Sequence, residues 1–308
     1  TLGRSRHGRA IISIRENEVA AEATGIPTTY YKLYAFTLAA FFAGIAGGLY
    51  AHQIGMLSPK TFGFNKSIEY LVMVVLGGMG SITGSIISSA VLVALPEFLR
   101  GFSEWRLVIY STLLIGMMLF RPSGLMGTKE FSLIKAWDGI GRWLKKTLRI
   151  KKRQAKMPYT PHYDVWEDTV VLETKNLGIR FGGLVAAEGI NLTLRNNEIV
   201  GLIGPNGAGK TTVFNMLTGV YAPTEDEIIL LSNSIRGMST HEITKNGIAR
   251  TFQNIRLFKS MTVLENIKVA FHTRMQYSPL SGIVRASSYQ TEEMGIDIRA
   301  RELLRVFD

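Results

Sequence analysis

The chain has 308 residues, with 35 Lys and Arg against 24 Asp and Glu, which gives a formal charge of +11. This length suits two domains, the absence of Cys excludes a disulfide-stapled mini-protein, and a hydrophobic content of 46% excludes wholesale disorder. A positive mean hydropathy of +0.15 beside a pI near 9.8 is typical of membrane proteins with basic cytoplasmic loops, and unusual for soluble nucleic-acid-binding proteins.

Residues 11–24 have apolar residues at helical spacing with charged residues between them, which predicts a short amphipathic helix. We expect this helix to end at Gly25, because glycine is common just beyond a helix C-terminus and Pro27 follows. Two interpretations are open from these residues: a solvated surface helix, or a docking surface for a cytoplasmic partner.

Residues 33–51 form the first run that could cross a membrane. The 19 residues carry no charge, which is enough for one helix to cross the ~30 Å hydrocarbon core. Gly44 and Gly48 lie four positions apart and permit close approach of another helix in lipid. The alternative, a buried helix of a soluble protein, is disfavoured by the apolar runs that follow.

Residues 70–96 form a second uncharged run, and its 27 residues exceed what one crossing needs. Glycines gather in its middle, where they are costly inside a helix. We therefore predict two shorter helices joined by an irregular loop at residues 77–81, an arrangement that often marks a transport pathway. One long, kinked helix is the alternative. A third run, residues 107–120, is consistent with either a short span or a packed helix.

The charges that flank these runs predict their orientation. Residues 1–32 carry five basic residues and the segment after Arg121 is far more basic, whereas residues 52–67 carry only Lys60 and Lys66. Basic flanks stay on the cytoplasmic side, so both ends of the membrane region are expected there. Two cytoplasmic ends require an even number of crossings, so the middle run must cross twice or enter and return. The sequence thus predicts a multi-pass protein of the cell (inner) membrane.

Residues 129–156 hold ten basic residues and two acids, which accounts for +8 of the net charge. Within this segment, residues 131–150 have apolar residues at helical spacing and two tryptophans, which is typical of an amphipathic helix on a membrane surface. Beside a membrane-spanning region the lipid bilayer is the simpler partner, and we expect no nucleic-acid binding. A nucleic-acid-binding ATPase is the alternative that this charge run would support.

From residue 169 the pattern changes to that of an α/β domain. Residues 170–173 and 189–194 have the composition of strands. Residues 198–203, EIVGLI, predict a buried strand that runs directly into a glycine-rich loop. The loop matches G-x-x-x-x-G-K-[ST], and a preceding strand and a following helix are the context that this phosphate-binding motif requires. We therefore predict an α-helical transmembrane segment followed by an α/β P-loop NTPase.

The residue types of the loop match the chemistry of a bound nucleoside triphosphate. Glycines let backbone N–H groups turn toward phosphates, and the helix that begins near Gly209 adds the positive end of its dipole. Lys210 would supply charge to the β- and γ-phosphates, and Thr211 would offer a hydroxyl to Mg²⁺. The candidate phosphate-binding residues are Gly204, Pro205, Asn206, Gly207, Ala208, Gly209, Lys210, Thr211 and Thr212. Phe181 could stack on the base, and an ordinary core Phe is an equally good interpretation.

Residues 201–212 resemble the nucleotide-binding domain of ABC transporters, and residues 247–253, GIARTFQ, resemble the Q-loop of that family. The stretches FNMLTG at 214–219, NIRLF at 254–258 and MTVLEN at 261–266 are similar to the ATP-binding subunits of branched-chain amino-acid importers. This likeness to one subfamily favours an importer.

The membrane half resembles the permease of the same transporters. Short motifs at residues 8–10, 14–18, 20–25, 75–81 and 121–125 carry this likeness. Each motif is weak alone, but together and beside the ATPase motifs they are specific. The resemblance implies that residues 20–25 belong to the cytoplasmic loop that docks on the ATPase, which favours the docking interpretation of this segment.

The resemblance also implies roles for individual residues. Phe181 would stack on the adenine, and Lys210, Thr211 and the loop amides would hold the phosphates and Mg²⁺. Gln253 would be the catalytic residue that reaches Mg²⁺ or the attacking water and couples this site to the permease. The expected cofactors are ATP and Mg²⁺, with Thr211 and Gln253 contacting the metal.

We expect three segments along the chain: the C-terminal portion of a permease at residues 1–126, a basic linker at 127–168, and the N-terminal portion of an ABC ATPase at 169–308. The signature loop, the Walker B strand and the switch His of the family do not follow Gln253 in this sequence. We therefore expect a nucleotide-binding domain that is incomplete at its C-terminus and inactive alone.

The function expected from these features is ATP-driven import of branched-chain or related hydrophobic amino acids, with the nucleotide domain in the cytoplasm. The expected partners are a second permease subunit, further ATPase subunits, an extracytoplasmic amino-acid-binding protein and the lipid bilayer. Two alternatives are a membrane-tethered P-loop NTPase that acts as a regulator and, within the family, a urea or amide importer.

Overall fold

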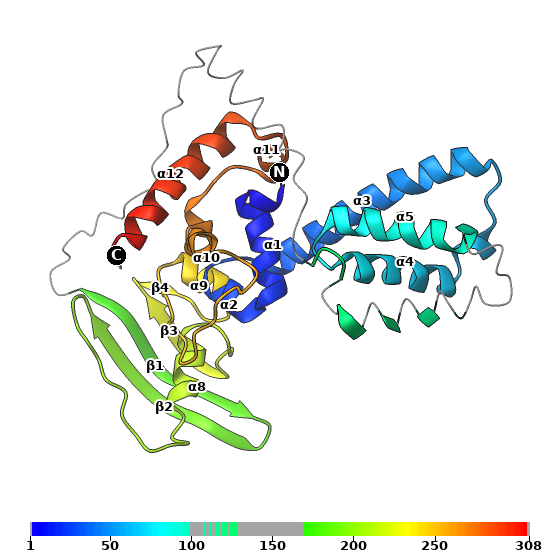
Figure 1. Ribbon diagram of the computed structural model, residues 1–308. Coiled ribbons are helices and arrows are strands. Elements are labelled where there is room, and N and C mark those ends of the chain that lie inside the picture. Colours follow the sequence, from blue (N-terminus) through cyan, green and yellow to red (C-terminus); the bar gives the residue numbers. More distant parts are fainter. Residues whose placement is uncertain are drawn as a thin grey trace, which may run out of the picture. The chain divides into compact units, whose positions relative to one another are not determined.

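The computed structural model describes residues 2–98, 108, 111–112, 115–116, 119–121, 124–127 and 169–306. The chain divides into two compact units, of which the first contains residues 1–40 and 153–308 and the second residues 41–152. Figure 1 marks the elements along the chain. The predicted amphipathic helix at 131–150 and most of the predicted apolar run at 107–120 lie outside the described residues.

The first unit combines helices from the N-terminal and the C-terminal parts of the sequence. Its helices are α1 (Arg6–Glu16), α2 (Glu18–Ala23), the beginning of α3 (Thr28–Ile54), α8 (Lys210–Leu217), α9 (Thr240–Lys245), α10 (Val263–Ala270), α11 (Pro279–Val284) and α12 (Ser287–Leu304), with 3-10 turns η1 (Leu2–Arg4) and η4 (His272–Arg274).

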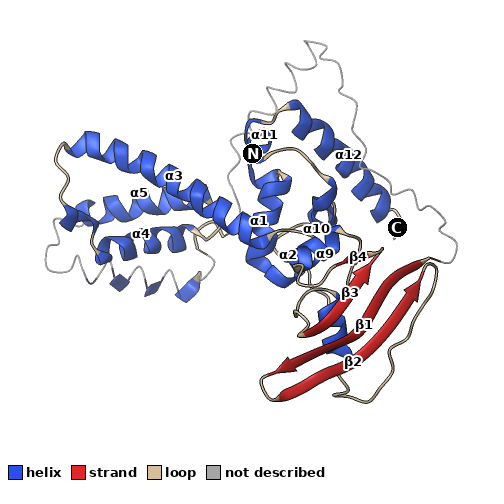
Figure 2. Ribbon diagram, turned by 180° about the vertical axis from the view of Figure 1, so that it is seen from behind, coloured by secondary structure: helices blue, strands red, loops and turns tan. Residues whose placement is uncertain are grey.

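An antiparallel sheet completes this unit. Its strands are β1 (Val170–Phe181), β2 (Leu184–Arg195), β3 (Glu225–Leu230) and β4 (Asn233–Ser234), in the order β2-β1-β3-β4 (Figure 2). The predictions of strands at residues 170–173 and 189–194 are confirmed, each as part of a longer strand. Aliphatic residues of the sheet pack against α8 and α9 in a buried core that includes Leu177, Met216, Ile228 and Ile243.

The predicted strand at residues 198–203 is wrong. This segment has no strand pairing, and the side chains of Ile199 and Ile203 are 98% and 95% exposed. An apolar strand of this kind is stable when parallel neighbours cover both its edges and its faces. The strands that the structure describes pair only antiparallel, in one sheet without a place for it.

The predicted helix at residues 11–24 is divided in two by Asn17. The backbone of Asn17 is extended, with φ −159° and ψ 101°, and its side-chain oxygen accepts a hydrogen bond from Ala20 N at 3.0 Å. Asparagine competes with the helix for backbone donors and is a good N-cap, so α1 ends and α2 begins here. The predicted end at Gly25 is confirmed, because Gly25 has φ +82° directly after α2.

Helix α2 and the beginning of α3 pack against the later part of the chain. Ala20, Ala21 and Ile26 are buried in one cluster with Phe258 and Val269. A Cβ on Gly25 would lie 2.3 Å from the methyl group of Thr273. Small residues at these positions let the two parts of the sequence approach closely. Residues of both parts then form one shared core.

Helix α3 contains the predicted span at residues 33–51. Its 27 residues make it the one helix of the described part of the chain that is long and apolar enough to cross a membrane. Space is open around Gly44 and Gly48, since no atom lies within 4 Å of a Cβ built on either. The apolar surface of α3 is therefore available to lipid or to another helix.

The second unit confirms the predicted break in the run at residues 70–96. Helix α4 (Phe64–Gly77) follows the turn η2 (Pro59–Phe62), and α5 (Ile82–Phe98) begins after the loop at 78–81. The Ser88 hydroxyl donates to Met73 O at 2.5 Å, so the two helices lie side by side. A Cβ on Gly84 would lie 2.1 Å from Gly77 O, so glycine is required where the backbones meet.

The close contact between Gly84 and Gly77 predicts that one added methyl group destabilises this helix pair. Gly84→Ala should destabilise the pair of α4 and α5, because the added Cβ overlaps Gly77 O. We expect a lower thermal unfolding temperature of the detergent-solubilised protein. Gly47→Ala in α3 is the matched control, since no atom lies within 4 Å of that Cβ. Equal unfolding temperatures for both variants would contradict the close approach of the helices.

Candidate nucleotide site

The glycine-rich loop at residues 204–209 joins the irregular segment after β2 to helix α8. Gly207 and Gly209 have φ +87° and +79°, which is the left-handed region that glycine adopts most easily. A Cβ on Gly209 would also lie 2.6 Å from Ala186 O in β2. Helix α8 begins at Lys210, as the motif predicts, and its first backbone N–H groups have no partner within the helix. The loop therefore has the shape and the donors that suit a bound anion.

Lys210 lies across the mouth of this loop. Its Nζ donates to Gly204 O and to Pro205 O, both at 2.6 Å. These carbonyl oxygens hold the ammonium group beside the loop amides, where a phosphate oxygen would compete for it. The positive charge of Lys210 therefore lies at the position where a bound phosphate would need it. Thr212 is half-buried in the first turn of α8, and Asn206 and Ala208 lie in the loop itself.

A cavity of about 620 Å³ lies between the sheet, α8 and the segment at residues 247–253. Thr211 and Gln253, the two residues predicted to contact the metal, both line it. Most of the remaining lining is aliphatic and comes from β1, β2 and α8. The hydroxyl of Thr211 and the amide of Gln253 are oxygen donors of the kind that Mg²⁺ prefers.

Phe181 lies at the end of β1 and is 46% exposed, so it is not an ordinary core residue. Its ring meets that of Tyr221 edge to face, with 5.3 Å between the centroids. Phe181 does not line the cavity of Thr211 and Gln253. The exposed ring face can accept a base, and Tyr221 limits how the ring tilts. Sequence reasoning missed Tyr221, which no motif distinguishes from other aromatic residues.

The segment around Gln253 is tied to α8 on one side. The Arg250 guanidinium donates to the Asn215 side-chain oxygen at 2.6 Å and to the Thr218 hydroxyl at 3.2 Å. Both acceptors lie at the end of α8, the helix that begins with Lys210. Arg250 therefore connects the end of α8 to the residues before Gln253.

On the other side the same segment is tied to α2. The Phe252 ring lies between two guanidinium groups, with the Arg250 carbon 5.5 Å and the Arg256 carbon 4.9 Å from its centroid. Arg256 also donates to the Asn17 side-chain oxygen at 3.3 Å, the same oxygen that caps α2. Sequence reasoning missed Asn17, Arg250 and Arg256. The signal that could have found them is the repeated arginine on both sides of Phe252 and Gln253.

The two halves of this site match two known families. Residues 1–121 match the family described as the permease component of the branched-chain amino acid transport system, and residues 187–304 match the ABC transporter family. The N-terminal part of the chain is thus similar to a permease component, and the later part to the ATP-binding cassette of an ABC transporter. The family implies ATP as the nucleotide, and the permease match with helix α3 indicates a membrane protein.

Individual relatives belong to branched-chain amino acid systems. The chain is 47% identical over 123 residues to BraF of Pseudomonas aeruginosa and 44% identical over 137 residues to LivG of Escherichia coli K12, both high-affinity branched-chain amino acid transport ATP-binding proteins. These stretches cover 40% and 44% of this chain, and 48% and 54% of the relatives. The chain therefore spans about half the length of these relatives.

The permease half has its own relative. It is 43% identical over 119 residues to LivM of Salmonella typhimurium, a high-affinity branched-chain amino acid transport system permease protein, covering 39% of this chain and 28% of LivM. A solved nucleotide-free ATP-binding cassette from an ABC transporter is 30% identical and covers 42% of this chain and 51% of its own, with a TM-score of 0.34. That score is too low to support an argument about the fold.

The geometry of Lys210 predicts the effect of its removal. Lys210→Met should weaken ATP binding at least about tenfold, because it removes the one positive charge held at the loop carbonyls while the loop backbone is kept. The measurement is equilibrium titration of the purified chain with a fluorescent ATP analogue. Lys259→Met, on the exposed surface, is the control. Unchanged affinity of the Lys210 variant would refute this site.

Proposed function

We propose that this chain acts in ATP-driven import of branched-chain or related hydrophobic amino acids, and supplies part of the permease and the ATP-binding loop. The observation that carries the proposal is the connection between α8, the segment of Gln253 and the permease helix α2 within one unit. The matches of each half to the permease and ATP-binding proteins of branched-chain systems support the substrate class.

Each predicted residue has a place in this mechanism. The amides of residues 204–209 and the Lys210 ammonium hold the phosphates of ATP, and Phe181 stacks on the adenine. Gln253 orients the attacking water. Mg²⁺, held by Thr211 and Gln253, supplies positive charge to the phosphate oxygens when it is bound. The side-chain oxygens of Thr211 and Gln253, which line one cavity, support this assignment.

Coupling follows from the contacts of Arg250 and Arg256. Binding of ATP fixes the beginning of α8, and Arg250 transmits the position of its end to Phe252. Arg256 then transmits it to Asn17 and so to α2, which continues through Gly25 into α3. In this mechanism the membrane region is multi-pass and the cassette is cytoplasmic. A second permease subunit, further ATPase subunits and an extracytoplasmic binding protein complete the importer.

Transport by the assembled importer tests the function. The chain is purified with its partner subunits, reconstituted in proteoliposomes and supplied with the amino-acid-binding protein. We expect uptake of labelled leucine that requires ATP and that Gln253→Ala lowers at least about tenfold without weakening ATP binding. Uptake of urea or amides in place of leucine would refute the substrate class. Nucleotide-dependent partner binding with no uptake would refute transport and support a regulator.

A second prediction concerns coupling alone. Phe252→Leu removes the ring that both guanidinium groups face, while keeping an apolar side chain. We expect ATP binding within about twofold of wild type and a loss of about fivefold or more in the stimulation of ATP hydrolysis by the loaded binding protein. Phe252→Tyr keeps a ring and should restore the stimulation. Full stimulation in the leucine variant would show that the ring carries no coupling.

A further inference from the structure

Helix α1 buries polar side chains against the cassette. Its buried residues include His7, Arg9 and Ser13, and Ser5, which caps the helix, is also fully buried. The surface that covers them comes from α10, α11, the segment after η4, and α12 (Figure 1). An apolar interface can bind many apolar surfaces. A buried polar interface binds well only to a surface that offers hydrogen-bond or charge partners to its polar groups.

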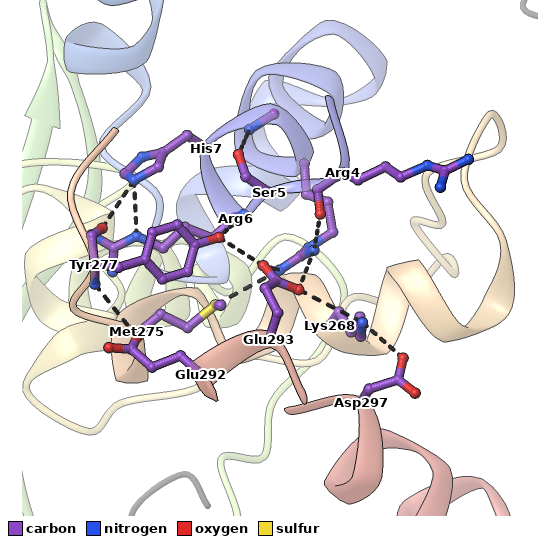
Figure 3. A network of polar contacts seen from close by, with 12 residues as sticks. Arg4, Ser5, Arg6, His7, Lys268, Met275, Tyr277, Glu292, Glu293 and Asp297 are labelled. Atoms are coloured by element: carbon purple, nitrogen blue, oxygen red, sulfur yellow. Dashed lines mark hydrogen bonds and ion pairs between the residues drawn. The ribbon is translucent and has the colours of Figure 1, made fainter. Parts of the chain in front are cut away.

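Arg9 is the charged centre of this contact. It is 4% exposed, and its two terminal nitrogens donate to the two carboxylate oxygens of Glu293 at 2.9 and 2.8 Å. Lys268 lies 3.7 Å from the same carboxylate and forms an ion pair with Asp297 at 2.8 Å. Figure 3 shows Glu293 between Tyr277 and Lys268. Removal of one partner from such a buried pair leaves the other without compensation.

A chain of neutral hydrogen bonds lies beside this ion pair. His7 Nε2 lies 3.1 Å from Tyr277 O and 3.3 Å from Arg6 Nε, which donates to it. His7 Nδ1 lies 2.8 Å from the Tyr31 hydroxyl oxygen, which in turn lies 3.3 Å from His272 Nε2. Burial above all, and then the charge of Arg6, lowers the pKa of His7 to about 4 and that of His272 to about 3. Both rings are therefore neutral at pH 7.

Tyr277 joins the two groups of contacts. Its hydroxyl donates to Glu293 Oε1 at 2.7 Å and accepts from the backbone N of Arg6 at 2.6 Å. Burial, followed by the charge of Glu293, raises the pKa of the Tyr277 phenol well above its usual value, so the hydroxyl remains a donor. Tyr277 thus meets both the backbone at the start of α1 and the carboxylate that pairs with Arg9.

From these contacts we propose that α1 is the element by which the permease part selects its cassette, with Glu293 and Tyr277 as the residues it recognises. The cassette that fits is the one in this chain, because residues 263–304 present the matching carboxylate and phenol. Without an acid at position 293, Arg9 would be buried unpaired and the contact would be rejected. The proposal rests on the proposed function, in which a permease needs one particular cassette. In this proposal α1 recognises the cassette, whereas α2 receives the change in position of α8 through Arg256.

A disulfide reports whether α1 is docked. A Cβ on Gly282 in α11 lies 3.2 Å from that of Ser5, slightly closer than the usual disulfide separation, so a small shift permits the bond. The sequence contains no Cys, so S5C with G282C gives no competing thiol within these residues. The full chain in membranes is treated with a mild oxidant, and the products are separated without reductant. We expect rapid formation of a monomer with an internal bond.

Variants at the ion pair test the recognition itself. In the S5C/G282C background, Arg9→Met should slow formation of the bond about tenfold or more, because Glu293 is left without its main partner. Glu293→Gln added to Arg9→Met should restore most of the rate, since no unpaired carboxylate then remains at the contact. Arg15→Met is the matched control, because the Arg15 side chain is 46% exposed at the other end of α1.

Three results would overturn the proposal. They are no bond in the S5C/G282C chain, a bond only between two chains, and the wild-type rate in the Arg9 variant. The disulfide needs neither nucleotide nor amino acid, so the test is independent of transport. Loss of leucine uptake with an intact Arg9-dependent bond would refute the proposed function and leave the recognition by α1 in place.

Discussion

The small side chains of Ala20 and Ala21 let helix α2 pack closely against the later part of the chain. Both are buried with Ile26, Phe258 and Val269, and glycine at position 25 lets the chain turn against Thr273. Larger side chains would hold the two parts of the sequence apart. Because the backbones approach this closely, Asn17 lies within reach of Arg256 and the polar start of α1 lies within reach of α12. The other contacts described above depend on this fit.

Charge is arranged differently in the two regions of this interface. Beside α1 the buried Arg9 guanidinium meets both carboxylate oxygens of the largely buried Glu293. Around Phe252 the guanidinium groups of Arg250 and Arg256 are bound to neutral acceptors and to a ring, interactions that are individually weak. Weak contacts can rearrange during a cycle of nucleotide binding, whereas a buried ion pair resists rearrangement. The two regions therefore differ in the kind of contact that their charged groups make.

Much of this could be predicted from local sequence. The broken helix at residues 70–96 and the loop before Lys210 depend on glycines, whose effect on the backbone is local. The strand at 170–173 follows from its β-branched and aliphatic residues, and the strand at 189–194 from its alternation. The segment at 198–203 could not be predicted in the same way, because an apolar run becomes a strand only when neighbouring strands pair with it. The Asn17 break was also missed, since apolar spacing does not reveal a side chain that caps the next turn.

The residues of the candidate site also fall into two groups: those that a local motif identifies and those that only the fold brings together. A contiguous motif identifies Lys210 and Thr211, and the family resemblance extends this to Gln253. Arg9 is more than 260 positions from both Tyr277 and Glu293 in the sequence. Only the folded chain brings the three residues together. Such contacts leave no pattern in one sequence. Their residue types are ordinary surface types, and burial alone makes them informative.

The covalent connection between permease and cassette lowers the affinity that their interface needs. Two separate proteins must find each other at their cellular concentrations, whereas two parts of one polypeptide meet at an effective concentration in the millimolar range when the linker permits it. An interface of this kind needs little affinity of its own. Helix α1 can therefore use polar groups that add selectivity at the expense of binding strength. The two parts are also produced in equal number.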